Sequence, residues 1–104
     1  TQQRLHYLLC DLDTYISDDL NKTLMAGTSP ADWDLPPSVD ELQELLFELP
    51  EKLEADYKED KFVNFKGYTT KTGLEIDNID EAISFNNFHE GLHVGTMLAL
   101  RKLT

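Results

Sequence analysis

The sequence predicts an all-α fold in which three long helices pack as an up-down bundle. Apolar residues recur at spacings of three and four over three long stretches, as they do along the buried face of a helix. Two of these stretches begin with Ser or Asn followed three residues later by Glu, which is the spacing of a capping box. Glycine and proline are few, and no low-complexity tract is present. We therefore expect a single helical domain over residues 1–104.

The first helix is predicted over residues 2–26. Its apolar positions form one face made of Leu5, Leu8, Leu9, Leu12, Tyr15, Ile16, Leu20 and Leu24. Gly27 follows as a C-terminal stop. The loop that comes next is marked by Pro30, Pro36 and Pro37 and contains Trp33.

The second helix is predicted to begin at Ser38, with Glu41 at the capping-box position, and to continue to about Tyr57. Pro50 lies inside this pattern and cannot donate a hydrogen bond to the carbonyl of Leu46. We therefore expect a kink or a restart of the helix there.

The segment 61–77 lacks helical periodicity. Its aromatic residues Phe62, Phe65 and Tyr68 predict a loop that lies partly over the core. The third helix is predicted from about Asn78 to about Leu103. Nothing in the chain predicts a β-sheet.

Composition narrows the classes of partner. The net charge is −11, from 20 acidic and 9 basic residues. A surface this negative repels phosphate backbones and anionic membranes, so we expect no nucleic-acid partner and no membrane partner. The single cysteine, Cys10, excludes an intramolecular disulfide, and no apolar run approaches the roughly 20 residues that span a bilayer. These features predict a cytoplasmic protein.

The three histidines are the residues with the clearest chemical potential. His89 and His93 stand four residues apart on a predicted helix, so their rings lie one above the other and can bind one metal ion. His6 lies on the apolar first helix, where a buried imidazole needs a partner for each nitrogen and a metal ion supplies one. The alternative is that these histidines are ordinary surface or hydrogen-bonded residues.

Residues 89–93 also match the H-E-x-x-H motif of zinc proteases. The longer protease pattern places a Gly and a third His downstream, where this chain has Thr96 and Ala99. No Asp, Glu or His follows His93. A third ligand would have to come from upstream, where His6 is the best candidate.

Two motifs make the chain resemble the DinB-like family of metal-dependent proteins. Residues 5–11, Leu-His-Tyr-Leu-Leu-Cys-Asp, are similar to the family's motif around a histidine of an early helix. Residues 89–95, His-Glu-Gly-Leu-His-Val-Gly, with Leu-Arg-Lys at 100–102, are similar to its last-helix motif. The Ser38 helix and the stretch 78–88 also resemble the family in order and spacing. Two departures are Thr96, where relatives often have Gln, and the absence from this segment of the family's first helix.

The resemblance implies a four-helix type of bundle that here lacks its first helix. It also implies one divalent metal ion (Zn, Ni or Fe) held by His6, His89 and His93, with an open coordination position. The implied function is that of a metal-dependent transferase or hydrolase acting on a small, thiol-type substrate. The alternative is a non-catalytic helical interaction module. Because a three-helix remnant leaves one apolar face uncovered, we expect a homodimer or a preceding helix to cover it.

Catalytic residues are not identified by the sequence, and only weaker candidates stand near the histidines. Glu90 lies about 100° around the helix from His89 and is a candidate base or outer partner. Asp13 follows His6 by two predicted helical turns and is a candidate for orienting a ligand. For both carboxylates the alternative is a solvated surface position. Cys10 is a candidate further ligand, with a buried apolar cysteine as the alternative.

Overall fold

The computed structural model describes all 104 residues and divides into two compact units. One unit contains residues 1–13 and 62–104, and the other contains residues 14–61. Four α-helices dominate the secondary structure, which confirms the all-α class. The finer expectation, a DinB-like up-down bundle, is not established by this arrangement.

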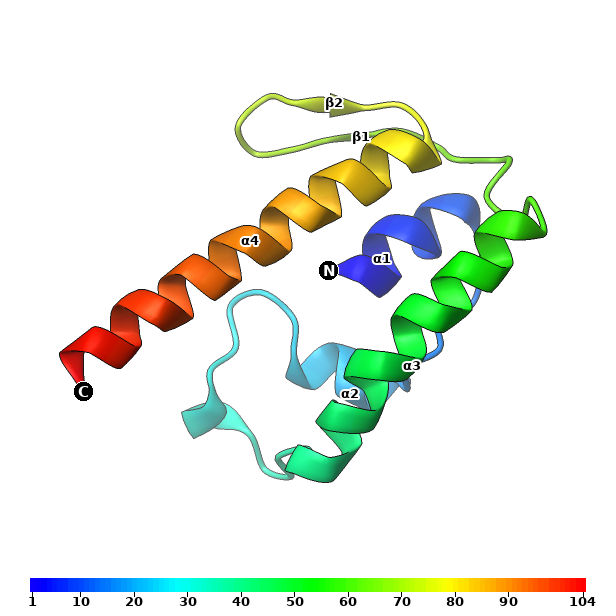
Figure 1. Cartoon of the computed structure of the whole chain (residues 1–104). Coiled ribbons are helices and arrows are strands. Elements are labelled where there is room, and N and C mark those ends of the chain that lie inside the picture. Colours follow the sequence, from blue (N-terminus) through cyan, green and yellow to red (C-terminus); the bar gives the residue numbers. More distant parts are fainter. The chain divides into compact units, whose positions relative to one another are not determined.

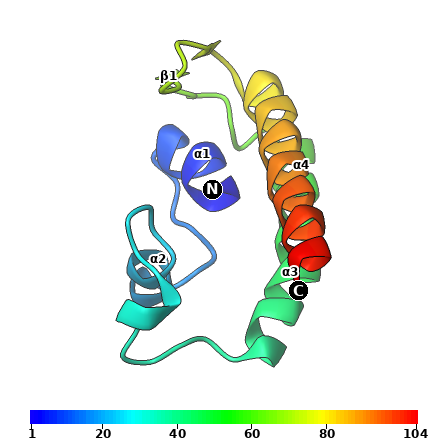
Figure 2. The ribbon, with the colours of Figure 1, turned by 90° about the vertical axis from the view of Figure 1, so that its left-hand side faces the viewer.

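The first unit is built around its last helix. It contains α1 (Gln2–His6), the 3₁₀ turn η1 (Leu8–Cys10), strands β1 (Tyr68–Thr69) and β2 (Glu75–Ile76), and α4 (Ile79–Leu103). In Figure 1, α1 lies beside the N-terminal half of α4, while the C-terminal half extends beyond it. Figure 2 shows the β1–β2 hairpin at the start of α4. The two strands are antiparallel, with Tyr68 paired to Ile76.

A small apolar core joins these elements. Leu5, Ile76 and Ala82 are buried, and Leu9, Phe65, Ile79 and Phe85 pack against them. Beside this cluster, the buried rings of Tyr7 and Phe62 meet edge to face with their centroids 5.1 Å apart. The prediction that aromatic residues of the 61–77 segment cover the core is confirmed for Phe62 and Phe65, whereas Tyr68 is exposed.

The prediction of one continuous helix over residues 2–26 is wrong. The chain leaves helical geometry at Asp11, whose φ is 56°, and becomes helical again only at α2 (Asp18–Thr23). A tertiary contact competes with the helix, because the Lys66 amide donates to the Leu9 carbonyl at 2.9 Å. Short polar side chains in this stretch favour turns over helix, and Ser17 caps the new helix through the Leu20 amide at 3.1 Å.

The second unit consists of α2, the 3₁₀ turn η2 (Pro30–Asp32) and α3 (Val39–Lys58). Of the two alternatives expected at Pro50, a kink or a restart, the restart is wrong, since α3 is one helix from Val39 to Lys58. Gly27 has the positive φ of 90° that a stop residue needs, but α2 already ends at Thr23.

The start of α4 agrees with its prediction. The Asn78 side chain accepts a hydrogen bond from the Glu81 amide at 2.9 Å, and the Glu81 carboxylate accepts from the Asp77 amide at 2.7 Å. The expectation of no β-sheet is wrong, because β1 and β2 pair as a short antiparallel ribbon. Gly73, in the turn between the two strands, has a φ of 91°. No helix combines the length and apolar character that crossing a bilayer would require.

The predicted cap of α3 has a measurable consequence. The Ser38 hydroxyl accepts from the Glu41 amide at 3.1 Å. Ser38→Ala should therefore lower the free energy of unfolding by about 1 kcal/mol in urea denaturation. Ser84→Ala, at an exposed position inside α4, should be neutral or slightly stabilising because alanine favours helix. An equal loss in both variants would contradict the cap.

Candidate metal centre

His89 and His93 form the centre of the candidate site. Both project from α4 one turn apart, and their Nε2 atoms are 2.9 Å from each other. The two rings are nearly perpendicular, with centroids 4.5 Å apart. His89 is half-buried and His93 is exposed, so the pair is open to small solutes. This confirms the expectation that the i, i+4 spacing brings two ring nitrogens together.

Two neighbours fix the position of His89. The Phe85 ring, one turn earlier on α4, lies with its centroid 6.1 Å from that of His89. The hydroxyl oxygen of Thr1, at the start of α1, is 3.2 Å from His89 Nε2. Sequence analysis missed both residues. Phe85 could have been found from its i−4 spacing, whereas only the packing of α1 on α4 brings Thr1 to the site.

The geometry of the pair is close to that of two ligands on one ion. With zinc–nitrogen bonds of about 2.0–2.1 Å and tetrahedral angles, two bound nitrogens stand roughly 3.3 Å apart. The observed 2.9 Å also suits a shared proton, donated by one neutral imidazole to the other. A cation that replaces this proton needs only a slight separation of the rings.

His6 is buried elsewhere in the same unit. Its side chain is fully buried, and neither ring nitrogen has a hydrogen-bond partner of good geometry. Burial lowers the pKa of His6, and the backbone of Ala82 acts in the opposite direction. Ala82 precedes His89 by seven residues, or roughly 10 Å along the helix axis.

The expected convergence of all three histidines is therefore not present. No group of three His, Cys, Asp or Glu side chains in the structure is placed to hold a metal ion. The physical reason is that His6 ends α1 near Ala82, while the beginning of α1 lies near His89. The structure thus brings together His89 and His93 but not His6.

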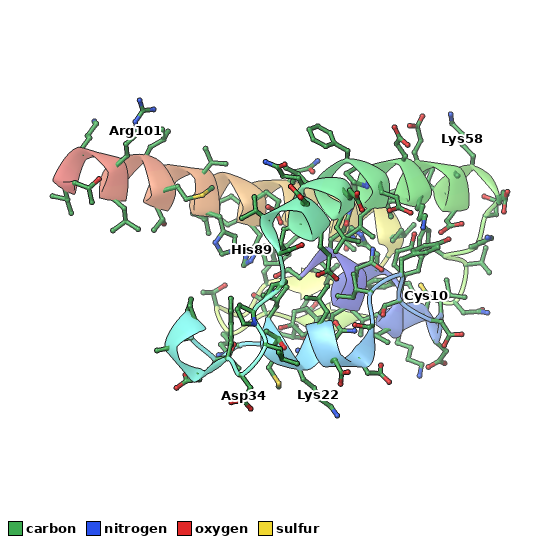
Figure 3. The ribbon with its side chains drawn as sticks, turned by 90° about the horizontal axis from the view of Figure 1, so that it is seen from below. Cys10, Lys22, Asp34, Lys58, His89 and Arg101 are labelled. Atoms are coloured by element: carbon green, nitrogen blue, oxygen red, sulfur yellow. The ribbon has the colours of Figure 1, made fainter.

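The weaker candidates, Asp13, Glu90 and Cys10, are likewise not part of any group of side chains placed to hold a metal ion. Asp13 is exposed in a non-helical segment, so its predicted place two turns along the helix from His6 is wrong. Glu90 is exposed on α4. Cys10 is buried in η1, and Figure 3 shows it well apart from His89. Burial, followed by the charge of Asp11, raises the pKa of the Cys10 thiol, as suits a buried apolar cysteine.

The burial of His6 predicts how stability depends on pH in the metal-free protein. Because the folded state disfavours the charged ring, the unfolded state binds more protons once pH falls below about 6.5. The free energy of unfolding should be fully retained above that pH and fall on acidification, by at most about 1.4 kcal/mol per pH unit.

The measurement is urea denaturation between pH 7.5 and 5, with a chelator present throughout. His6→Gln removes the titrating group, so its stability should vary less with pH than that of the wild type. Identical pH profiles for the two proteins would refute this role for His6.

Searches with protein-family models, against curated proteins and against solved structures found no match to this chain.

Proposed function

We propose that this chain is a divalent-metal-binding protein of the DinB-like type, with His89 and His93 as two of its ligands. The observation that carries the proposal is the 2.9 Å separation of their Nε2 atoms on a solvent-accessible part of α4. A helix holds the two Cβ atoms one above the other, so only side-chain torsions remain to be ordered when an ion binds, which lowers the entropic cost. Imidazole suits zinc, nickel and ferrous iron alike, so these are the metals proposed.

His6 is proposed as the third ligand. Its two ring nitrogens are buried without a hydrogen-bond partner of good geometry, and a poorly paired buried polar group is costly unless something satisfies it. His6 is the last residue of α1, and Thr1, the N-cap residue of that helix, contacts His89. Joining the pair would require α1 to shift along α4, and a short helix can move more readily than a long one.

The proposed activity follows from a site with few ligands. A divalent ion held by neutral imidazoles keeps its full charge and can lower the pKa of a bound thiol or water. We propose a small thiol-type substrate and a transferase or hydrolase reaction. Around the pair, the chain's own residues would orient His89 through Phe85 and Thr1 and leave the side of His93 open for the substrate.

The experiment is elemental analysis of protein purified without a metal-affinity column. The proposal expects about one equivalent of zinc, nickel or iron per chain, and its loss in a His89→Ala, His93→Ala double variant. Thr96→Ala, one turn beyond Leu92 on the same helix, is the matched control and should retain the metal. A metal-free wild type that also fails to bind added zinc would overturn the proposal.

A second candidate is a non-catalytic interaction module. The observation that favours it is the exposed apolar surface on the C-terminal half of α4. Such patches commonly mark interfaces with other proteins. Metal content distinguishes the two functions, because an interaction module needs no ion at His89 and His93.

A further inference from the structure

A groove lies between the β1–β2 hairpin and the first half of α4, two elements of the same compact unit. In Figure 1 the hairpin runs beside this half of the helix. The groove has a volume of about 520 Å³, which is within the usual range for sites that bind small molecules. No residue of the 14–61 unit lines it, so its walls are formed by one unit alone.

Apolar side chains form a large part of the groove. Ile76 is almost fully buried in the core of the unit, and Phe85 packs against that core. Leu74 and Phe88 also line the groove and are more than half exposed. The rings of Phe85 and Phe88 have their centroids 6.3 Å apart and their planes tilted by 45°. These side chains can bury the apolar body of a ligand, and the face of a phenyl ring attracts a cation.

The charged residues of the groove are all acidic. They are Glu75, Asp80 and Glu81, and no lysine, arginine or histidine lines the groove. Glu75 forms no ion pair with a basic side chain of the chain. Glu81 uses one carboxylate oxygen, Oε2, to accept from the Asp77 amide. The groove therefore favours a ligand with positive charge, and the net charge of −11 adds to this attraction at longer range.

We propose that this groove binds a small organic ammonium ion with an apolar body. The apolar body contacts the four apolar side chains, and the ammonium group lies among the carboxylates, where its hydrogen bonds are charge-assisted. A neutral ligand of the same shape lacks these bonds, and an anionic ligand is repelled. His89 and His93 do not line the groove, so this binding is separate from the proposed metal site.

The first test compares three probes that share one apolar body, namely phenylbutylammonium, phenylbutanol and phenylbutyrate. Calorimetric titration of the full chain, with a chelator present and at low ionic strength, measures their affinities without a contribution from bound metal. The ammonium probe should bind with a dissociation constant below about 1 mM. The alcohol should bind at least about tenfold more weakly, and the carboxylate should not bind. Added salt should weaken binding of the ammonium probe.

Two results of this titration would overturn the proposal. One is an ammonium probe that does not bind at about 5 mM. The other is an alcohol or a carboxylate that binds as tightly as the ammonium probe, because binding would then not depend on positive charge.

The second test uses variants of the groove. Glu75→Gln removes one negative charge, and Phe88→Leu removes one aromatic ring but keeps an apolar side chain. Each should raise the dissociation constant of the ammonium probe at least about threefold. Glu90→Gln is the matched control for charge, because Glu90 is exposed on α4 roughly 180–200° around the helix from Glu81 and Phe88. It should change the dissociation constant by less than about twofold.

Circular dichroism should show equal helix content in the three variants. Backbone amide NMR signals of the wild type should shift on addition of the ammonium probe within residues 74–88 and stay unchanged within residues 97–103. Equal effects of Glu75→Gln and Glu90→Gln would mean that the cation associates with the acidic surface in general, and would overturn the proposed site. Shift changes that leave out residues 74–88 would overturn it as well.

Discussion

Asp56→Ala should lower the free energy of unfolding by about 2 kcal/mol, because it removes the shared acceptor of two charge-assisted hydrogen bonds. The Asp56 carboxylate is buried in the 14–61 unit, where it accepts from the Tyr15 hydroxyl at 2.7 Å and pairs with the Lys61 ammonium at 2.9 Å. It thereby ties both ends of the unit to α3. These contacts raise the pKa of Tyr15 and the pKa of Lys61, chiefly through the hydrogen bonds to Asp56.

Urea denaturation would measure this loss. Glu54→Ala is the matched control, because Glu54 is an exposed carboxylate on the same helix that pairs with Lys58 at 2.8 Å. Exposed pairs contribute less than about 1 kcal/mol, so the control should lose little stability. Tyr15→Phe removes one of the hydrogen bonds to Asp56 and should cost about 1.5 kcal/mol. Equal losses for Asp56→Ala and Glu54→Ala would contradict the buried network.

His89→Ala and His93→Ala should each weaken zinc binding by more than about 100-fold. Loss of an outer-shell partner typically costs tenfold to a hundredfold, and loss of a direct ligand should exceed that. Helix content should remain near that of the wild type, because His93 is exposed, His89 is only half-buried and the apolar core is made of other residues.

Calorimetric titration of metal-free protein with zinc would measure the affinities. Thr96→Ala should bind as the wild type does. His6→Ala tests the third ligand separately, because a loss as large as that of His89→Ala supports a three-histidine site. An unchanged affinity in His6→Ala would reduce the site to the α4 pair, and an unchanged affinity in all three histidine variants would reject the site.

Local sequence signals predicted the elements that are stabilised locally. Ser38 and Asn78 cap α3 and α4 as expected, because capping depends on side chains within the same turn. The His89–His93 contact followed from helix geometry alone. These features need no knowledge of distant residues, so a single sequence is sufficient for them.

Features that depend on distant contacts were not predictable in this way. Residues 2–26 have helical periodicity, yet the contact from Lys66 to Leu9 helps to end the helix early. Because the helix ends early, Asp13 and Cys10 do not have the helical spacing from His6 on which their predicted positions depended. The position of His6 near Ala82, and that of Thr1 beside His89, are set by how α1 packs on α4, which periodicity does not determine.

X-ray absorption at the zinc edge of the zinc-loaded protein tests the central claim most directly, because it counts the nitrogen ligands and measures their distances. The proposed site predicts three imidazole nitrogens at about 2.0–2.1 Å, falling to two in His6→Ala. A zinc ion surrounded by carboxylate and water oxygens, with no imidazole scattering, would contradict the assignment of His89 and His93 as metal ligands.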